Sequence, residues 1–158
     1  MSMICIGVVE MPDRRSYPDL ESRISEIIQN HGFSARWAID WKEPIVETFS
    51  NHPVIFSMVD GDEHDNCEML LLPDHWVVNG KTNTVPARKR MQLFDDIAKY
   101  AISQYSKIDF YIGESGTLPD EYEQIQIDCL QLSAFLIDQL ERLNTCLSLH
   151  ITIVDSVT

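Results

Sequence analysis

Paired cysteines, long apolar runs and catalytic motifs are all missing from this sequence. The four cysteines are far apart and form no C-x-x-C pair, so we expect free thiols and a reducing, cytoplasmic location. The apolar runs, such as Met3–Val9 and Met69–Leu72, are far shorter than the roughly 20 residues of a membrane-spanning helix. We therefore predict a chain without a membrane segment, and we assign it no metal and no cofactor.

Basic residues are also scarce. The chain has 12 Lys and Arg residues against 25 Asp and Glu residues, which gives a formal net charge of −13 over 158 residues. Nucleic acids and anionic membranes are bound through clustered Lys and Arg, so neither is expected as a partner. The negative charge instead favours solubility and rapid encounter with a cationic partner.

The acidic residues form two blocks that contain no Lys or Arg. The first block lies between Lys42 and Lys81, and the second lies between Lys107 and Arg142. The segment that separates them carries the following basic residues: Lys81, Arg88, Lys89, Arg90, Lys99 and Lys107. A basic segment thus lies between two acidic ones, and the acidic blocks are the natural place to look for contacts with a basic protein.

Hydrophobic periodicity predicts a mixed α/β fold in a single globular domain, 1–158. Apolar stripes at helical spacing predict at least three helices, at about 17–31, 86–104 and 118–143. Each follows a Ser or Thr and has a proline in its first turn, which is typical of a helix start. A break in the third helix near 131–133 is left open.

Apolar or alternating runs predict the strands of a mixed parallel/antiparallel sheet. The predicted strands are 3–9, 33–39, 54–59, 67–72, 75–78, 108–112 and 147–154. Strands 54–59 and 67–72 are expected to form a hairpin across the polar turn between them. Strands 108–112 and 147–154 are expected to run parallel through a right-handed crossover, because a long helix is predicted between them.

The densest acidic cluster lies in the predicted turn over 60–66. Its oxygen ligands would suit a hard cation, but it lacks the glycine at the sixth position and the flanking helices of an EF-hand, so no metal is predicted. Loop tips often carry contacts, and tryptophan beside charge is a common interface anchor, although a simple solvated turn is the alternative. The candidate partner-binding residues are Asp60, Asp62, Glu63, Asp65, Trp41 and Trp76.

A second candidate site lies at the glycine-rich turn over 113–117, between a predicted strand and a predicted helix. Phosphates bind at this position in many α/β proteins. The turn lacks the Walker lysine and the G-x-G-x-x-G spacing, and Glu114 would repel phosphate. A turn whose glycines allow positive φ, and basic side chains that pair with the chain's own acidic blocks, are the simpler interpretations. The alternative function is a small enzyme or an anion-binding or phosphate-binding domain, with a site composed of Arg88, Arg90, Gly113, Ser115 and Gly116.

No catalytic residues are predicted. The five histidines form no H-E-x-x-H pattern, and the turn around Ser115 misses G-x-S-x-G by one residue, so binding is preferred to catalysis. In size, acidity and lack of a catalytic signature, the chain resembles the small inhibitor or immunity proteins that neutralise bacterial toxins. The resemblance implies acidic side chains that replace the phosphates normally bound by a basic partner, such as a toxin nuclease. A subunit of an oligomer, held by the third helix, is a further interpretation.

Overall fold

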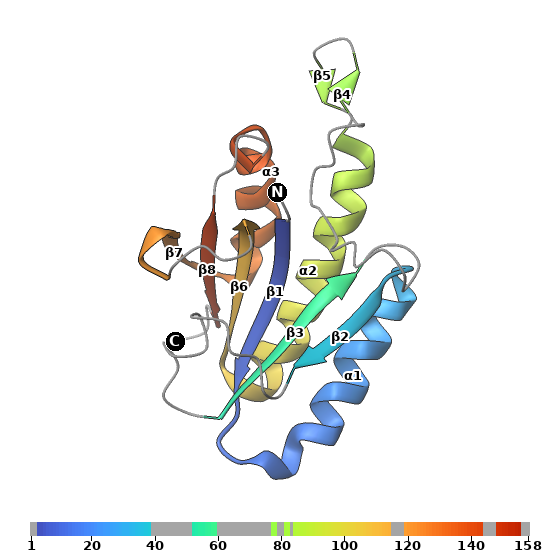
Figure 1. Ribbon diagram of the computed structural model, residues 1–158, viewed down its shortest axis with the longest axis vertical. Helices are drawn as coiled ribbons and strands as arrows, with labels where there is room; N and C mark the ends of the chain where they lie inside the picture. Colours follow the sequence, from blue (N-terminus) through green and yellow to red (C-terminus); the bar gives the residue numbers. More distant parts are fainter. Residues whose placement is uncertain are drawn as a thin grey trace.

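The computed structural model describes residues 3–38, 52–59, 77–78, 81–82, 84–114, 119–143 and 148–155. Their centre is a six-stranded mixed sheet with the strand order β2-β3-β1-β6-β8-β7 (Figure 1). Its strands are β1 (Met3–Glu10), β2 (Ser34–Ala38), β3 (Pro53–Val59), β6 (Lys107–Glu114), β7 (Glu123–Asp128) and β8 (Leu149–Val154). Strands β7 and β8 pair in parallel, and all other neighbours in this sheet pair antiparallel.

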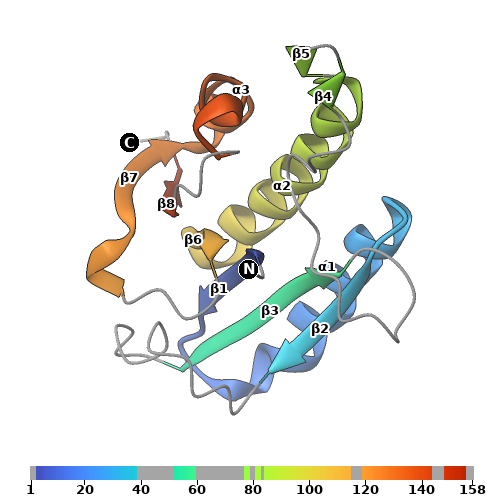
Figure 2. The same ribbon diagram turned by 45° about the horizontal axis from the view of Figure 1, so that its top comes forward.

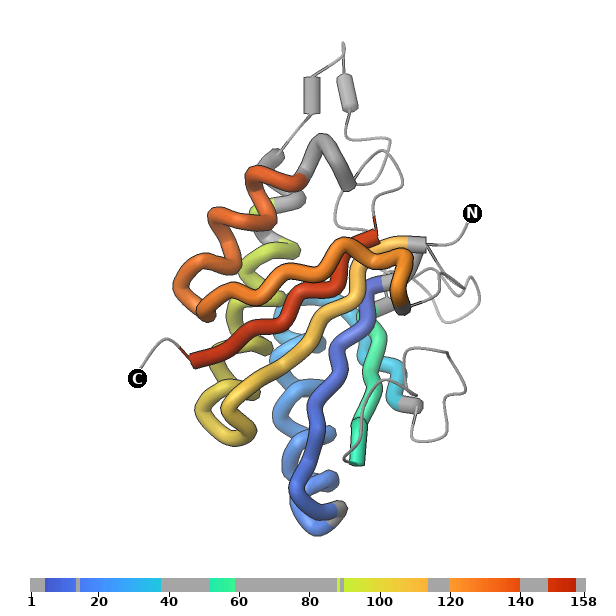
Figure 3. Tube along the Cα trace, turned by 90° about the vertical axis from the view of Figure 1, so that its left-hand side faces the viewer, coloured from blue at the N-terminus to red at the C-terminus, as the bar shows by residue number. Residues whose placement is uncertain are grey.

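Three α-helices cover one face of the sheet, and Figure 3 shows them behind it. They are α1 (Tyr17–Asn30), α2 (Thr84–Tyr105) and α3 (Leu132–Leu143). Short 3-10 turns occur at Arg14–Ser16, Pro119–Glu121 and Cys129–Gln131, and a separate small hairpin pairs β4 (Val77–Val78) with β5 (Lys81–Thr82). The predicted mixed α/β fold with at least three helices is confirmed.

The main core lies between the helices and the sheet. Alternate residues of β1 and β6 point into it, among them Cys5, Val9 and Phe110, which are at most 1% exposed. Gly7 belongs to the same row of β1, and a Cβ added there would lie 2.1 Å from Cζ of Phe56 on β3. Only glycine therefore leaves room for this aromatic ring.

The opposite face of the sheet changes from apolar to polar across its width. The cross-strand register aligns its side chains in two rows that run from β3 to β7. The rows are Ser57–Ile6–Tyr111–His150–Gln124 and Ile55–Val8–Asp109–Thr152–Gln126. The β3 and β1 side of this face belongs to a second small hydrophobic cluster, whereas β8 and β7 present polar side chains.

The predicted third helix is wrong over its first half. Residues 119–131 form two 3-10 turns on either side of β7, and α3 begins only at Leu132. A capping box ends the strand: the Asp128 side chain accepts the N–H of Leu130, and the Asp128 N–H donates to the Gln131 side chain. The capping residue that precedes α3 is thus Asp128, at the end of β7, and the helix does not begin near Pro119.

The prediction that strands 108–112 and 147–154 run parallel is also wrong. Strand β6 pairs antiparallel with β8, because β7 intervenes in the chain and supplies the parallel partner through α3. The other predicted helices, and the strands that the structure describes in full, agree with the observed bounds to within two residues. Strand 67–72 and its hairpin with 54–59 lie outside the described residues.

Candidate functional site

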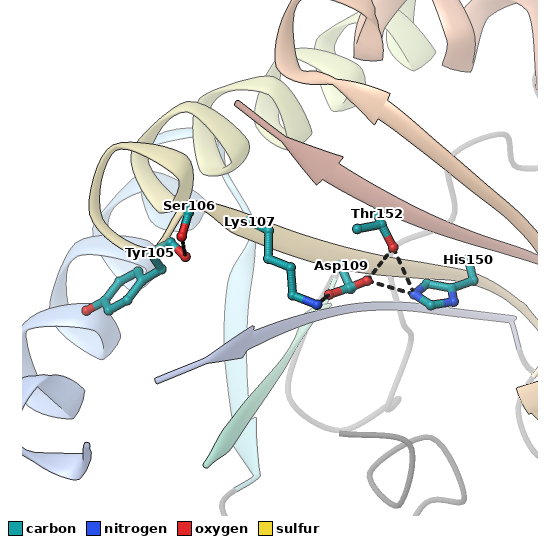
Figure 4. A network of polar contacts seen from close by, with 6 residues as sticks. All are labelled: Tyr105, Ser106, Lys107, Asp109, His150 and Thr152. Carbon is teal, nitrogen blue, oxygen red and sulfur yellow. Dashed lines mark hydrogen bonds and ion pairs between the residues drawn. The ribbon is translucent and has the colours of Figure 1, made fainter. Parts of the chain in front are cut away.

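The most polar part of the sheet is a network of side chains around Asp109 of β6 (Figure 4). Asp109 is only 2% exposed, so its polar side chain is buried. Its Oδ1 accepts a hydrogen bond from Thr152 Oγ1 at 2.6 Å and lies 2.8 Å from His150 Nε2. Lys107 Nζ lies 3.8 Å from Oδ2. The partners offset the cost of burying the carboxylate.

The pairing of β6 with β8 assembles this network. Asp109 lies opposite Thr152 and Tyr111 lies opposite His150, so side chains at every second position of both strands meet on one face. The His150 ring stacks on the Tyr111 ring, with the centroids 4.1 Å apart and the planes at 12°. The Tyr122 ring packs edge-on against the Tyr111 ring, at a centroid distance of 5.2 Å. Ring packing and a hydrogen bond therefore fix the orientation of His150.

The hydrogen bonds within the network limit which of its side chains could transfer a proton or act as a nucleophile. Asp109 holds Nε2 of His150, which leaves Nδ1 as the nitrogen that could exchange a proton with another molecule. The Thr152 hydroxyl lies 3.5 Å from His150 Nε2, and this hydroxyl already donates to Asp109. Nor do the described residues contain a group of three side chains that could hold a metal ion. The network therefore fits the internal pairing of a buried carboxylate better than a nucleophilic centre.

A cavity of about 380 Å³ lies beside the network, between the end of β1 and the turn from α2 into β6, and is lined by residues 10–12 and 104–107. Ser106 forms this turn with a φ of +66°, which is uncommon for a residue other than glycine. The Ser106 hydroxyl donates to the carbonyl of Tyr105 at 2.6 Å. Burial raises the pKa of the Tyr105 phenol, so this side chain is neutral at pH 7. Lys107 belongs to both the cavity and the network.

The candidate partner-binding residues lie outside the part of the chain that the structure describes, and they stay a prediction from sequence. These are Asp60, Asp62, Glu63, Asp65, Trp41 and Trp76. The same holds for Ser115 and Gly116 of the alternative anion site.

The remaining residues of the alternative site make separate contacts. Arg90 is 8% exposed, and its guanidinium carbon lies 5.2 Å from the ring centroid of Phe33, just before β2. Gly113 lies on β6, where an added Cβ would be 2.5 Å from the hydroxyl oxygen of Ser148, just before β8. Strands β3 and β1 lie between β2 and β6, so the contacts of Arg90 and Gly113 are on different parts of the sheet. Arg88 is exposed on α2.

Part of the second acidic block lies at an edge of the sheet. Asp120 and Glu121 lie in the 3-10 turn that leads into β7, and Glu123 and Asp128 are its first and last residues. Strand β7 pairs only with β8 among the described strands. These four acidic residues thus lie in or beside a strand at the periphery of the described sheet.

More acidic groups gather at the far end of β7, around Cys129. Burial, followed by the negative charge of Asp95, raises the pKa of the Cys129 thiol, and the charges of Asp128 and Asp155 act in the same direction. Lys99 opposes them, and its Nζ lies 2.9 Å from a carboxylate oxygen of Asp95. Among the described groups that act on the Cys129 thiol, carboxylates therefore outnumber cations.

No family model, curated protein or solved structure matches the chain. None of the described helices is both long and apolar enough to cross a membrane.

Proposed function

We propose that this protein is an acidic, cytoplasmic binding protein that neutralises a basic protein partner, as an immunity protein neutralises a toxin nuclease. The observation that carries the proposal is the net charge of −13, together with two acidic blocks that contain no Lys or Arg. A nuclease grips phosphates with Lys and Arg, so a carboxylate surface can occupy the same side chains. The proposed contact residues of the first block are Asp60, Asp62, Glu63 and Asp65, with Trp41 and Trp76 as apolar anchors.

Observations on the described residues support a binding role over catalysis. The carboxylate of Asp109, the most deeply buried acidic group among them, is already engaged by Thr152, His150 and Lys107. Four residues of the second acidic block lie in or beside the edge strand β7, whose Gln124 and Gln126 side chains are exposed. Cys5 and Cys129 are free thiols, and this supports the cytoplasmic location that forms part of the proposal.

The proposal is tested by capture from native lysate at low salt, with two charge-matched double variants beside the wild type. Asp62→Lys with Asp65→Lys reverses the proposed surface. Asp19→Lys with Glu26→Lys changes the net charge equally, but on exposed positions of α1. We expect wild type and the α1 variant to retain one basic protein in a stoichiometric complex that salt dissociates. The Asp62/Asp65 variant should associate with it at least about tenfold more slowly.

Two results would count against the proposal. The wild-type protein could retain no basic protein, or the two double variants could lose the partner to the same extent. The second result would show a general attraction between opposite net charges, without a defined surface. Inhibition of the captured partner's activity by the wild-type protein would establish neutralisation.

A further inference from the structure

We infer that the outer edge of β7 is a docking site for an extended basic segment of the partner, which adds to the sheet as a further strand. The inference rests on the proposed function, because it specifies how a basic partner is held. Three features of the described residues support it: the direction of the backbone groups of β7, the position of β7 in the sheet and the charge around it.

The backbone of β7 has hydrogen-bonding groups that face away from the sheet. Glu123 N–H donates to the carbonyl of Ser148 at 2.9 Å, so the backbone groups of Glu123 face β8. Because these groups alternate along a strand, those of Gln124 and Gln126 face outward. Asp128 fits the same alternation, since its N–H donates to the Gln131 side chain at 3.3 Å instead of to β8.

The outward groups of Gln124 and Gln126 meet no partner in the part of the chain that the structure describes. Figures 1 and 2 both show β7 at the outer edge, and no described helix or strand lies beyond it. The side chains of both glutamines are exposed as well. An edge strand with unpaired N–H and C=O groups is a template for strand addition.

The negative charge around the β7 edge indicates that the added strand is basic. Asp120 and Asp128 lie at the two ends of this edge, and no Lys or Arg occurs between Lys107 and Arg142. A second copy of the chain would bring the same carboxylates to the edge, and like charges on neighbouring strands repel each other. The opposite edge strand, β2, carries Arg36 and no carboxylate, so it lacks the same complementarity.

The side chains of β7 also indicate the pattern of the added strand. Gln124 and Gln126 are exposed on one face, and Ile125 and Ile127 are half-buried on the other. An added strand places its own side chains alternately on these two faces. The segment that fits best therefore alternates basic and apolar residues, with the basic side chains beside the glutamines.

The probe is a synthetic eight-residue peptide of alternating lysine and valine. Its control is the same peptide with every backbone nitrogen methylated, which keeps the charge and removes the donors. At about 0.15 M salt we expect the methylated peptide to bind the wild-type protein about tenfold more weakly or worse, because its backbone bonds are lost. Binding of the unmodified peptide should slow hydrogen exchange of the Gln124 and Gln126 amides.

Two protein variants test the same edge from the other side. Gln126→Pro removes one outward N–H, and proline is tolerated at edge positions whose N–H does not bond within the sheet. Gln126→Ala keeps the backbone donor and is the matched control. We expect Gln126→Ala to bind the peptide as wild type does, and Gln126→Pro to bind it several-fold more weakly with an unchanged melting temperature.

Equal affinity for the two peptides, or unchanged exchange of the Gln124 and Gln126 amides, would overturn the inference. Either result would show attraction by charge without strand addition. The proposed function would then still rest on the capture experiment with the Asp62 and Asp65 reversals, so the two failures are distinguishable.

Discussion

Replacing Gly7 by alanine tests how β1 packs against β3 at the centre of the sheet. The new Cβ would lie 2.1 Å from Cζ of Phe56, and 2.6 and 2.7 Å from the two Cε atoms of the ring. An ordinary contact between carbon atoms is about 3.5 Å, so the ring or the strand would have to move by roughly 1.4 Å. Phe56 is 0% exposed, and its ring centroid lies 5.1 Å from that of Trp37, which limits the space for such a movement.

The expected cost follows from two opposing effects. Overpacking a core costs about 1–3 kcal/mol, and the large overlap here favours the upper end of that range. Replacing glycine within a strand returns about 0.5–1 kcal/mol of backbone entropy. We therefore expect Gly7→Ala to lower the free energy of unfolding by about 2 kcal/mol. Urea denaturation followed by circular dichroism measures this directly.

A double-mutant cycle identifies the cause. Phe56→Leu alone should cost about 1–2 kcal/mol, less than is typical of Phe→Ala, because part of the side chain is kept. In the Gly7→Ala background the same change removes the overlapping ring atoms, so the double variant should be more stable than the sum of the single effects predicts. Gly32→Ala is the control: it has a φ of +85° and nothing within 4 Å, so it should cost about 1 kcal/mol without coupling to Phe56.

Two outcomes would refute this reasoning. Gly7→Ala could change the free energy of unfolding by less than about 0.5 kcal/mol, the size of an ordinary surface effect. Alternatively, Gly7→Ala and Phe56→Leu could be additive, which would show that the ring does not cause the loss.

Two further predictions concern buried and half-buried carboxylates. Thr152→Val removes a donor to Asp109 with little change of shape, and should cost about 1–3 kcal/mol in urea denaturation; an unchanged midpoint would contradict it. Burial alone would raise the pKa of Asp96, but hydrogen bonds from Gln92 and His31 outweigh it and lower the pKa below 3.8. Asp96 therefore adds stability above pH 3.8 that is lost as the pH falls through its folded pKa. The free energy of unfolding of the Asp96→Asn variant, measured by urea denaturation, should fall less steeply than that of the wild type as the pH is lowered through this range. An equally steep fall in both proteins would contradict the assignment.

Hydrophobic periodicity predicted most helices and strands correctly, because many segments fit either the helical or the strand spacing but not both. Leu20, Ile24 and Ile28 recur at helical spacing, and all three are buried on α1. The segment 119–131 fits two periods at once. Tyr122, Ile125 and Cys129 follow a helical spacing of three and four, while 123–128 also alternates as a strand. Local spacing alone could not decide between them, and the pairing with β8 did.

The network around Asp109 could not be found from sequence because it depends on register. His150 and Thr152 lie 41 and 43 positions from Asp109 along the chain. The sequence does show polar residues at every second position of both strands, which indicates a polar face but not which strands are neighbours. The pairing of β6 with β8 supplies that information. The contact of Arg90 with Phe33 likewise joins distant parts of the chain and could not be read from the sequence.

The most direct test of the central claim is the association rate of this protein with its captured basic partner, measured at rising salt concentration. If carboxylates form the binding surface, the rate should fall steeply with salt, and the Asp62→Lys and Asp65→Lys double variant should associate at least about tenfold more slowly at low salt. The Asp19→Lys and Glu26→Lys variant should stay close to wild type. An association rate that responds to neither salt nor the reversal at Asp62 and Asp65 would contradict the account.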